Sequence, residues 1–270
     1  MKIIEVSKIR NFGWNFTDEY IKKIYILYLY AISGRKPQIA TYKNLQNDLE
    51  EYIKSTPIPP RYQSTVNAKT LRQLSVLEDY GIINLNTFAN NEGWNSVYDH
   101  FFTDLGVAFS HYCKIRIDLV SHINSNKIND RQQNKIMNEL DQILADFIVI
   151  FLSNLVSSDD YKNYFKLYTI LLETIDLYGT LEEDMFYLIA TEINNNVVHD
   201  QILEEVKLLK NKKLELRKNG IQNNAWNYST SDLIRGKILV QIKDKDKGKL
   251  LIASKNKNYS KFKKVLDNEQ

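Results

Sequence analysis

The first residues that could do chemistry are hydrogen-bonding side chains clustered in one short segment: Asn67, Lys69, Thr70, Arg72 and Gln73. Leu71, Leu74 and Leu77 recur there at three-residue spacing, which is typical of a helix with one apolar face. Thr65 suits the N-cap and Gly81 suits the position just after the helix. We therefore predict a helix whose leucines are buried and whose polar face enters a major groove, where Arg suits guanine and Asn or Gln suits adenine.

A second set of candidate contacts lies in the last quarter of the chain and is mostly basic. Side chains of this kind hold phosphates and make binding fall steeply with salt. The predicted phosphate contacts are Arg217, Lys218, Lys243, Lys245 and Lys247, supported by Lys212, Lys213, Lys249 and Lys255. Trp94, Asn224 and Trp226 are added as aromatic and amide contacts to nucleic acid. The alternative for the lysines is an ordinary solvated face, and for the tryptophans it is core packing.

Charge is distributed by region along the chain. Residues 1–116 carry a net charge of +3, residues 117–206 carry −11 and residues 207–270 carry +11. A polyanion such as nucleic acid would be attracted to the last segment and to parts of the first. The acidic middle would face solvent or another protein.

Patterns for catalysis are incomplete. A magnesium-dependent nuclease of the restriction type needs two acids and a lysine, and the nearest match is Asp232, Gln241 and Lys243, in which glutamine replaces the second acid. His100, His111 and His122 are spaced by eleven residues, which is not a zinc-ligand spacing. We therefore assign no catalytic residue, no metal ligand and no cofactor in this chain. Magnesium is expected only if a nuclease domain is present elsewhere.

Periodicity and turn residues predict a mainly helical chain with small β-hairpins. The expected helices cover residues 17–32, 42–54, 65–80, 103–112, 130–156, 161–177, 180–194, 200–218, 223–234 and 259–266. Two strand pairs are expected, 82–85 with 96–102 and 236–243 with 249–255. Thr180 and Glu183 are expected to form a capping box.

The two halves of the chain share one layout: helix end, glycine, apolar strand, polar wing, apolar strand and short helix. This order is typical of a winged helix-turn-helix. The predicted class is α+β, with two winged-helix-like subdomains at residues 1–112 and 158–270 joined by a helical connector at 113–157.

These segments resemble the DNA-recognition part of type IIS restriction endonucleases, the AlwI-like and BpuJI-like enzymes. The resemblance covers roughly residues 17–266 and rests on NAKTLRQLSVLEDYGIINL, FTDLGVAF and NNAWNYSTSDLIRGKILVQ. It implies that one chain recognises a short asymmetric duplex sequence, while a separate PD-(D/E)xK nuclease domain cleaves. That nuclease signature is missing here. The chain is thus expected to be either a specificity fragment of a longer enzyme or a binder that works with a nuclease subunit.

The expected location is the cytoplasm. Cys113 is the one cysteine, so no internal disulfide can form, and the longest apolar run is shorter than the roughly 20 residues that cross a bilayer. Double-stranded DNA is the expected partner, with no membrane and no small-molecule cofactor. Two alternatives stay open: a divergent magnesium-dependent endonuclease built on Asp232, Gln241 and Lys243, and a winged-helix adaptor in phage defence or plasmid replication.

Overall fold

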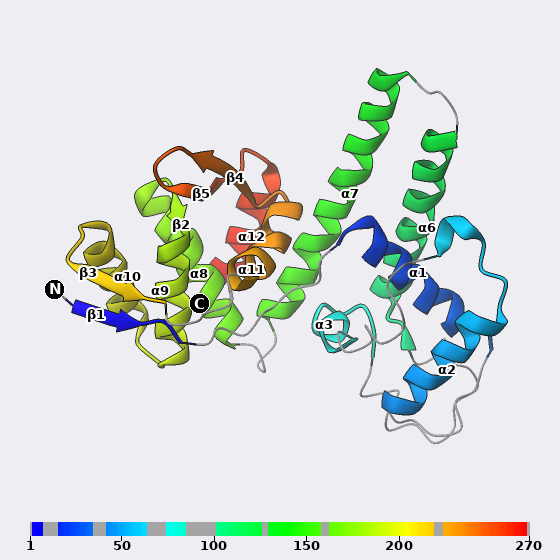
Figure 1. The fold of residues 1–270 in the computed structure, drawn as a ribbon, viewed down its shortest axis with the longest axis horizontal. Coiled ribbons are helices and arrows are strands. Elements are labelled where there is room, and N and C mark those ends of the chain that lie inside the picture. Colours follow the sequence, from blue (N-terminus) through cyan, green and yellow to red (C-terminus); the bar gives the residue numbers. More distant parts are fainter. Residues whose placement is uncertain are drawn as a thin grey trace. The chain divides into compact units, whose positions relative to one another are not determined.

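A computed structural model of the chain describes residues 2–7, 16–34, 42–63, 74–84, 101–125, 129–157, 162–218 and 224–268 (Figure 1). The chain divides into two compact units. Unit 1 comprises residues 1–13 and 144–270, and unit 2 comprises residues 14–143. The first residues of the chain therefore belong with its C-terminal half. This division differs from the expected boundaries, which assigned residues 1–112 to one subdomain.

Unit 2 is built from helices in its described part. These elements are α1 (Asp18–Ala31), α2 (Tyr42–Ser55), the short 3-10 helix η1 (Pro60–Tyr62), α3 (Leu74–Asp79), α6 (Asp104–Ser125) and the first half of α7 (Asp130–Val156). Helix α1 packs mainly on α6. Phe16 is fully buried, and its ring lies 6.0 Å from that of Tyr80 and 5.9 Å from that of Phe109. Aromatic packing thus joins the segments around α3 and α6.

The end of α3 leads into a short extended segment. Gly81 has a φ of 72°, so the residue expected just past this helix does adopt the left-handed conformation. Ile83 then forms an isolated antiparallel bridge with Phe102. The predicted wing between these residues lies outside the described part of the chain.

The first turn of α6 is anchored to that bridge by Thr103. Its hydroxyl accepts a hydrogen bond from the Gly106 amide at 2.9 Å and donates one to the Gly81 carbonyl at 2.6 Å. Thr103 therefore satisfies a free helix donor and ties the helix to the preceding turn.

Unit 1 contains a three-stranded antiparallel sheet of order β2-β5-β4. Its elements are β1 (Lys2–Glu5), the second half of α7, α8 (Lys162–Tyr178), β2 (Leu181–Glu182), α9 (Glu183–Asn194), α10 (His199–Lys210), β3 (Leu214–Arg217), α11 (Asn224–Arg235), β4 (Leu239–Asp244), β5 (Gly248–Ala253) and α12 (Lys257–Asn268). Helix α9 is the most deeply buried of these, with Phe186, Tyr187 and Leu188 fully inaccessible to solvent.

Two expectations for unit 1 are wrong. The helix expected to extend to Lys218 ends at Lys210, and β3 then pairs in parallel with β1, Lys2 lying opposite Leu214. Thr180 forms no capping box, because Leu181 and Glu182 are extended and pair with Leu251 and Leu250 of β5. Helix α9 begins after Glu182, without a side-chain cap. Sheet pairing has overridden the local helix pattern at both places.

The fold is mainly helical with small sheets, as predicted at that level. Helices α1, α2, α7, α8 and α11 and the β4–β5 hairpin agree with the predicted segments to within one to three residues. Among the described residues, no helix is both long enough and apolar enough to span a bilayer.

Candidate nucleic-acid interface

The β4–β5 hairpin carries an exposed group of lysines. Lys243 on β4 lies directly opposite Lys249 on β5, and Lys245 and Lys247 lie in the turn between the strands. All four side chains are exposed, whereas Leu250 and Leu251 anchor β5 in the core. Two like charges directly opposite on neighbouring strands repel each other. The hairpin therefore presents positive charge at a cost to its own stability.

Helix α11 continues this surface. Its Asn227 is exposed, and the side-chain oxygen accepts a hydrogen bond from Lys249 Nζ at 3.4 Å. Helix α11 packs on β4 and α9. We call Asn227, Lys243, Lys245 and Lys249 the hairpin surface. Asn227 was not among the contacts predicted from the sequence. It follows Trp226 directly, and consecutive residues point to different sides of a helix.

Acidic groups offset some of the nearby cations. Glu182 binds Lys247 at 2.7 Å, and the hydrogen bond to this carboxylate raises the pKa of Lys247. Asp244 accepts hydrogen bonds from the backbone amides of Lys247 and Asp246, which lower the pKa of its carboxyl. The side chains of Lys243, Lys245 and Lys249 form no ion pair with any residue in the described ranges. They are the hairpin cations best placed to take up an external anion.

Four other predicted phosphate contacts lie on β3 or next to it: Arg217 ends the strand, Lys218 follows it, and Lys212 and Lys213 precede it. Lys218 is engaged by Asp184 at 2.5 Å and lies 4.7 Å from the centre of the Tyr187 ring, so it already has partners. Arg217, Lys212 and Lys213 are exposed, and their side chains form no ion pair within the part of the chain that is described.

Trp226 does not lie on this surface, which corrects the expectation that it contacts nucleic acid. Its side chain is 1% exposed, and its ring lies 5.4 Å from that of Phe186 in an edge-to-face arrangement. The ring is thus part of the core of unit 1, where α11 meets α9. The flat face that base stacking requires is covered by the protein itself.

Several predicted contacts lie outside the described residues. They are Asn67, Lys69, Thr70, Arg72, Gln73 and Trp94, together with the side chain of Asn224. Of the helix expected around them, the structure describes Leu74–Asp79, in which Leu77 is fully buried as predicted. Base readout by this segment remains a prediction.

The acids and histidines in the described part of the chain do not gather into a metal site. Asp232 is 1% exposed, and its charge contributes, after burial, to raising the pKa of the buried Tyr168, whereas Gln241 and Lys243 are exposed on β4. The three groups of the divergent nuclease pattern therefore do not share a solvent-open surface. Within the described ranges, no group of three or more His, Cys, Asp or Glu residues could hold a metal ion.

Two of the described histidines contact neighbouring side chains, and the cysteine is buried. His199 contacts Glu173 at 2.5 Å between α10 and α8, and the His111 ring lies 5.5 Å from that of Tyr28. Cys113 is fully buried in α6, and this burial raises the pKa of its thiol far above the usual range. A thiol in that state is a poor nucleophile.

No family model, no curated protein and no solved structure matches this chain.

Proposed function

We propose that the chain binds double-stranded DNA, with the hairpin surface of unit 1 as one of its contact regions. The observation that carries the proposal is the exposed pair Lys243 and Lys249 on opposite strands, beside the exposed amide of Asn227. Two backbone phosphates, one at each lysine, relieve the mutual repulsion of these side chains, and the neighbouring amide can hydrogen-bond to a base edge or a sugar.

The element order of unit 1 supports this proposal. Helix α8, strand β2, helix α9, helix α11 and the β4–β5 hairpin follow one another as in a winged helix-turn-helix, with α10 and β3 inserted between α9 and α11. The sheet order β2-β5-β4 agrees with that fold. In such an arrangement α11 is the recognition helix and the β4–β5 turn is the wing.

The role within a larger system rests on the sequence resemblance. We propose that the chain is the target-recognition part of a restriction-modification endonuclease, with cleavage carried out by a nuclease domain or subunit that holds magnesium. In this proposal the polar segment at Asn67–Gln73 of unit 2 reads bases, while the hairpin surface holds the backbone. A module of this kind needs no catalytic residue of its own.

Removing the two opposing lysines tests the electrostatic part of the proposal. Lys243→Ala combined with Lys249→Ala is expected to weaken binding to a 30-base-pair duplex about tenfold in fluorescence anisotropy, since each lysine neutralises a phosphate. The slope of log affinity against log salt should fall by roughly 1.8, at about 0.9 per phosphate contact.

A matched control removes the same charge elsewhere. Lys54 and Lys207 are exposed and lie outside the hairpin surface, so replacing both by alanine is expected to leave affinity and slope within about twofold. If both double variants weaken binding equally, the hairpin surface has no special role. Selection of bound duplexes from a random library then shows whether one short sequence is preferred.

A further inference from the structure

A cavity of about 230 Å³ opens in unit 2 between α1, η1 and the second half of α6. Its size is slightly below that of typical small-ligand pockets. Ile21, Ile117 and Val120 form an apolar part of the wall, and Ile21 is fully buried. The remainder of the wall is polar: Asp18, Lys22, Arg61, Arg116, Ser121, Asn124 and Ser125.

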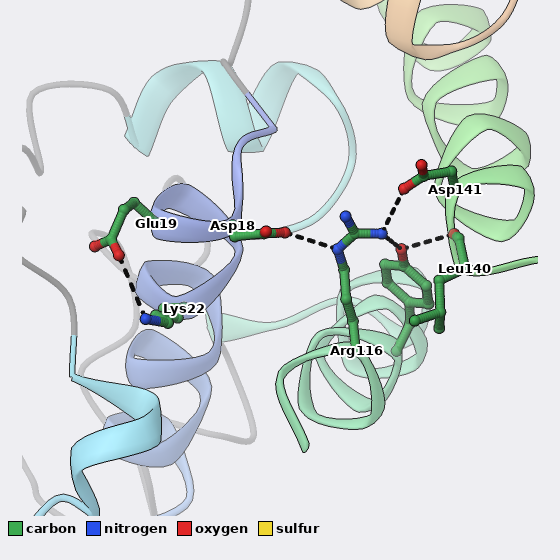
Figure 2. Close-up of polar contacts among 7 residues, drawn as sticks. Asp18, Glu19, Lys22, Arg116, Leu140 and Asp141 are labelled. Atoms are coloured by element: carbon green, nitrogen blue, oxygen red, sulfur yellow. Dashed lines mark hydrogen bonds and ion pairs between the residues drawn. The ribbon is translucent and has the colours of Figure 1, made fainter. Parts of the chain in front are cut away.

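Arg116 is the fixed point of this cavity. Its side chain is 6% exposed; Nε donates to Asp18 Oδ1 at 2.9 Å, and Nη1 donates to Asp141 Oδ1 at 2.7 Å, as Figure 2 shows. Nη1 also lies 3.3 Å from the Tyr112 hydroxyl, which in turn donates to the Leu140 carbonyl at 2.9 Å. The guanidinium is thus held in one orientation by α1, α6 and α7.

One nitrogen of that guanidinium has no hydrogen-bond partner in the described part of the chain. Nη2 makes no hydrogen bond to any residue that the structure describes. Burial alone would lower the pKa of Arg116, but Tyr112, Asp141 and Asp18 outweigh it and raise the pKa, so the group stays charged. A charged, immobile donor beside an apolar wall favours a ligand that carries a negative group next to a carbon skeleton.

Other donors surround the same space. Lys22 is paired with Glu19 at 3.3 Å, which is a long contact, and Arg61 is held by Asp118 at 2.8 Å. The Asn124 side chain makes no hydrogen bond within the described residues. Asp18 is the one carboxylate among the residues that line the cavity. The three cations of the wall are paired with carboxylates, Asp18 within the wall and Glu19, Asp118 and Asp141 outside it. The Nη2 edge of Arg116 and the Asn124 amide are therefore the donors left for a ligand.

We propose that this cavity binds a small organic anion, a carboxylate or phosphate monoester attached to a short apolar group. The anionic end lies toward Arg116 and Lys22, and the apolar end lies on Ile21, Ile117 and Val120. A backbone phosphate of duplex DNA is the less suitable occupant, because its sugars offer no apolar group for this wall. The proposal is independent of DNA binding, since none of its residues belongs to the hairpin surface.

Calorimetric titration of the whole chain with phenyl phosphate tests the site. We expect phenyl phosphate to bind at least about tenfold more tightly than inorganic phosphate, because its ring buries apolar surface. Amide NMR shifts should concentrate at Ile21, Val120, Ser121 and Asn124. Equal affinity for the two probes, or shifts spread over both units, would overturn the proposal.

Two variants, one truncating and one isosteric, are expected to change the affinity for phenyl phosphate in opposite directions. Lys22→Ala removes a wall cation and is expected to weaken phenyl phosphate binding roughly fivefold, whereas Asp18→Asn removes the wall carboxylate and is expected to strengthen it roughly fivefold. Lys135→Ala removes an exposed cation on α7 outside the cavity and should change nothing. Circular dichroism checks that each variant is folded.

A cationic probe completes the experiment. Benzylammonium has a similar ring and the opposite charge, and it is expected not to bind at the same concentrations. If benzylammonium binds more tightly than phenyl phosphate, or if both variants shift affinity in one direction, the cavity is not an anion site. Saturation with the 30-base-pair duplex should leave the affinity for phenyl phosphate unchanged, which separates a small-molecule ligand from a DNA phosphate.

Discussion

Trp226→Ala is expected to lower the free energy of unfolding of unit 1 by about 3 to 5 kcal/mol, the range found for large aromatic side chains cut from a core. Trp226 is 1% exposed and packs edge-to-face on Phe186, which is itself fully buried. Alanine would leave a cavity between α11 and α9. Urea unfolding followed by circular dichroism, together with hydrogen exchange of the α11 amides, measures the loss in this unit.

Trp226→Phe is the matched control. The indole Nε1 is buried and makes no hydrogen bond within the described part of the chain, so phenylalanine loses little beyond volume. Its cost is expected to stay below about 1.5 kcal/mol, and its affinity for duplex DNA should equal that of the natural chain. A stable Ala variant together with a Phe variant of weakened DNA affinity would contradict the assignment of Trp226 to the core.

The residues around Trp226 in the sequence do not indicate that its side chain is buried. The buried face of α11 contains Trp226, Ser229, Thr230 and Leu233, which has the spacing of an apolar stripe. Two of the four are hydroxyl residues, so the stripe does not stand out by hydropathy. The Thr230 hydroxyl donates a hydrogen bond to the Trp226 carbonyl at 2.7 Å, so this polar group is satisfied inside the core. A tryptophan beside small hydroxyl residues therefore looked like a surface contact.

Elements with strong local patterns were predictable. Helix α7 begins at Asp130 and ends at Val156 as expected, since Asn129 accepts a hydrogen bond from the Arg131 amide at its start and its second half is mostly apolar. Gly248, with a φ of 77°, likewise lies where the expected hairpin turn ends, as the first residue of β5. In both cases the residues that define the element are its own neighbours in sequence.

Elements that depend on distant partners were not predictable from their own residues. Strand β3 alternates Leu214 and Leu216 with Glu215 and Arg217, but its partner β1 lies at the other end of the chain. The preceding lysine-rich and leucine-rich segment has good helix propensity, which favoured one long helix. Lys212, with a φ of 56°, is the residue at which the chain turns away from that helix.

The positive charge of the candidate interface was predictable, but its compensation was not. Lysine spacing alone indicated a basic hairpin, and the structure adds that Glu182 engages Lys247 while Asp184 engages Lys218. Both acids lie at the start of α9, far from these lysines in sequence. Only the fold distinguishes a lysine that is already paired from Lys243 and Lys245.

Gly106 explains how α6 can begin against the segment at Ile82. The glycine is buried in the first turns of this helix, where glycine normally costs about 1 kcal/mol relative to alanine. A Cβ atom at this position would lie 1.9 Å from the Ile82 carbonyl oxygen and 2.9 Å from a ring carbon of Phe102. The first contact is with backbone, which cannot rotate away as a side chain can. Helix propensity therefore predicts that an alanine at this position stabilises unit 2, whereas packing predicts that it destabilises the unit.

Packing is expected to dominate, so Gly106→Ala should destabilise unit 2 by about 3 kcal/mol or more, as severe overpacking does. The control is Gly34→Ala in the same unit: Gly34 has a φ of 73° but open space around it, so its cost should be about 1 kcal/mol. Urea unfolding and hydrogen exchange of the α6 amides measure both. Should Gly106→Ala stabilise the unit, or cost no more than Gly34→Ala, the close approach of α6 to Ile82 would be wrong, and with it the bridge between Ile83 and Phe102.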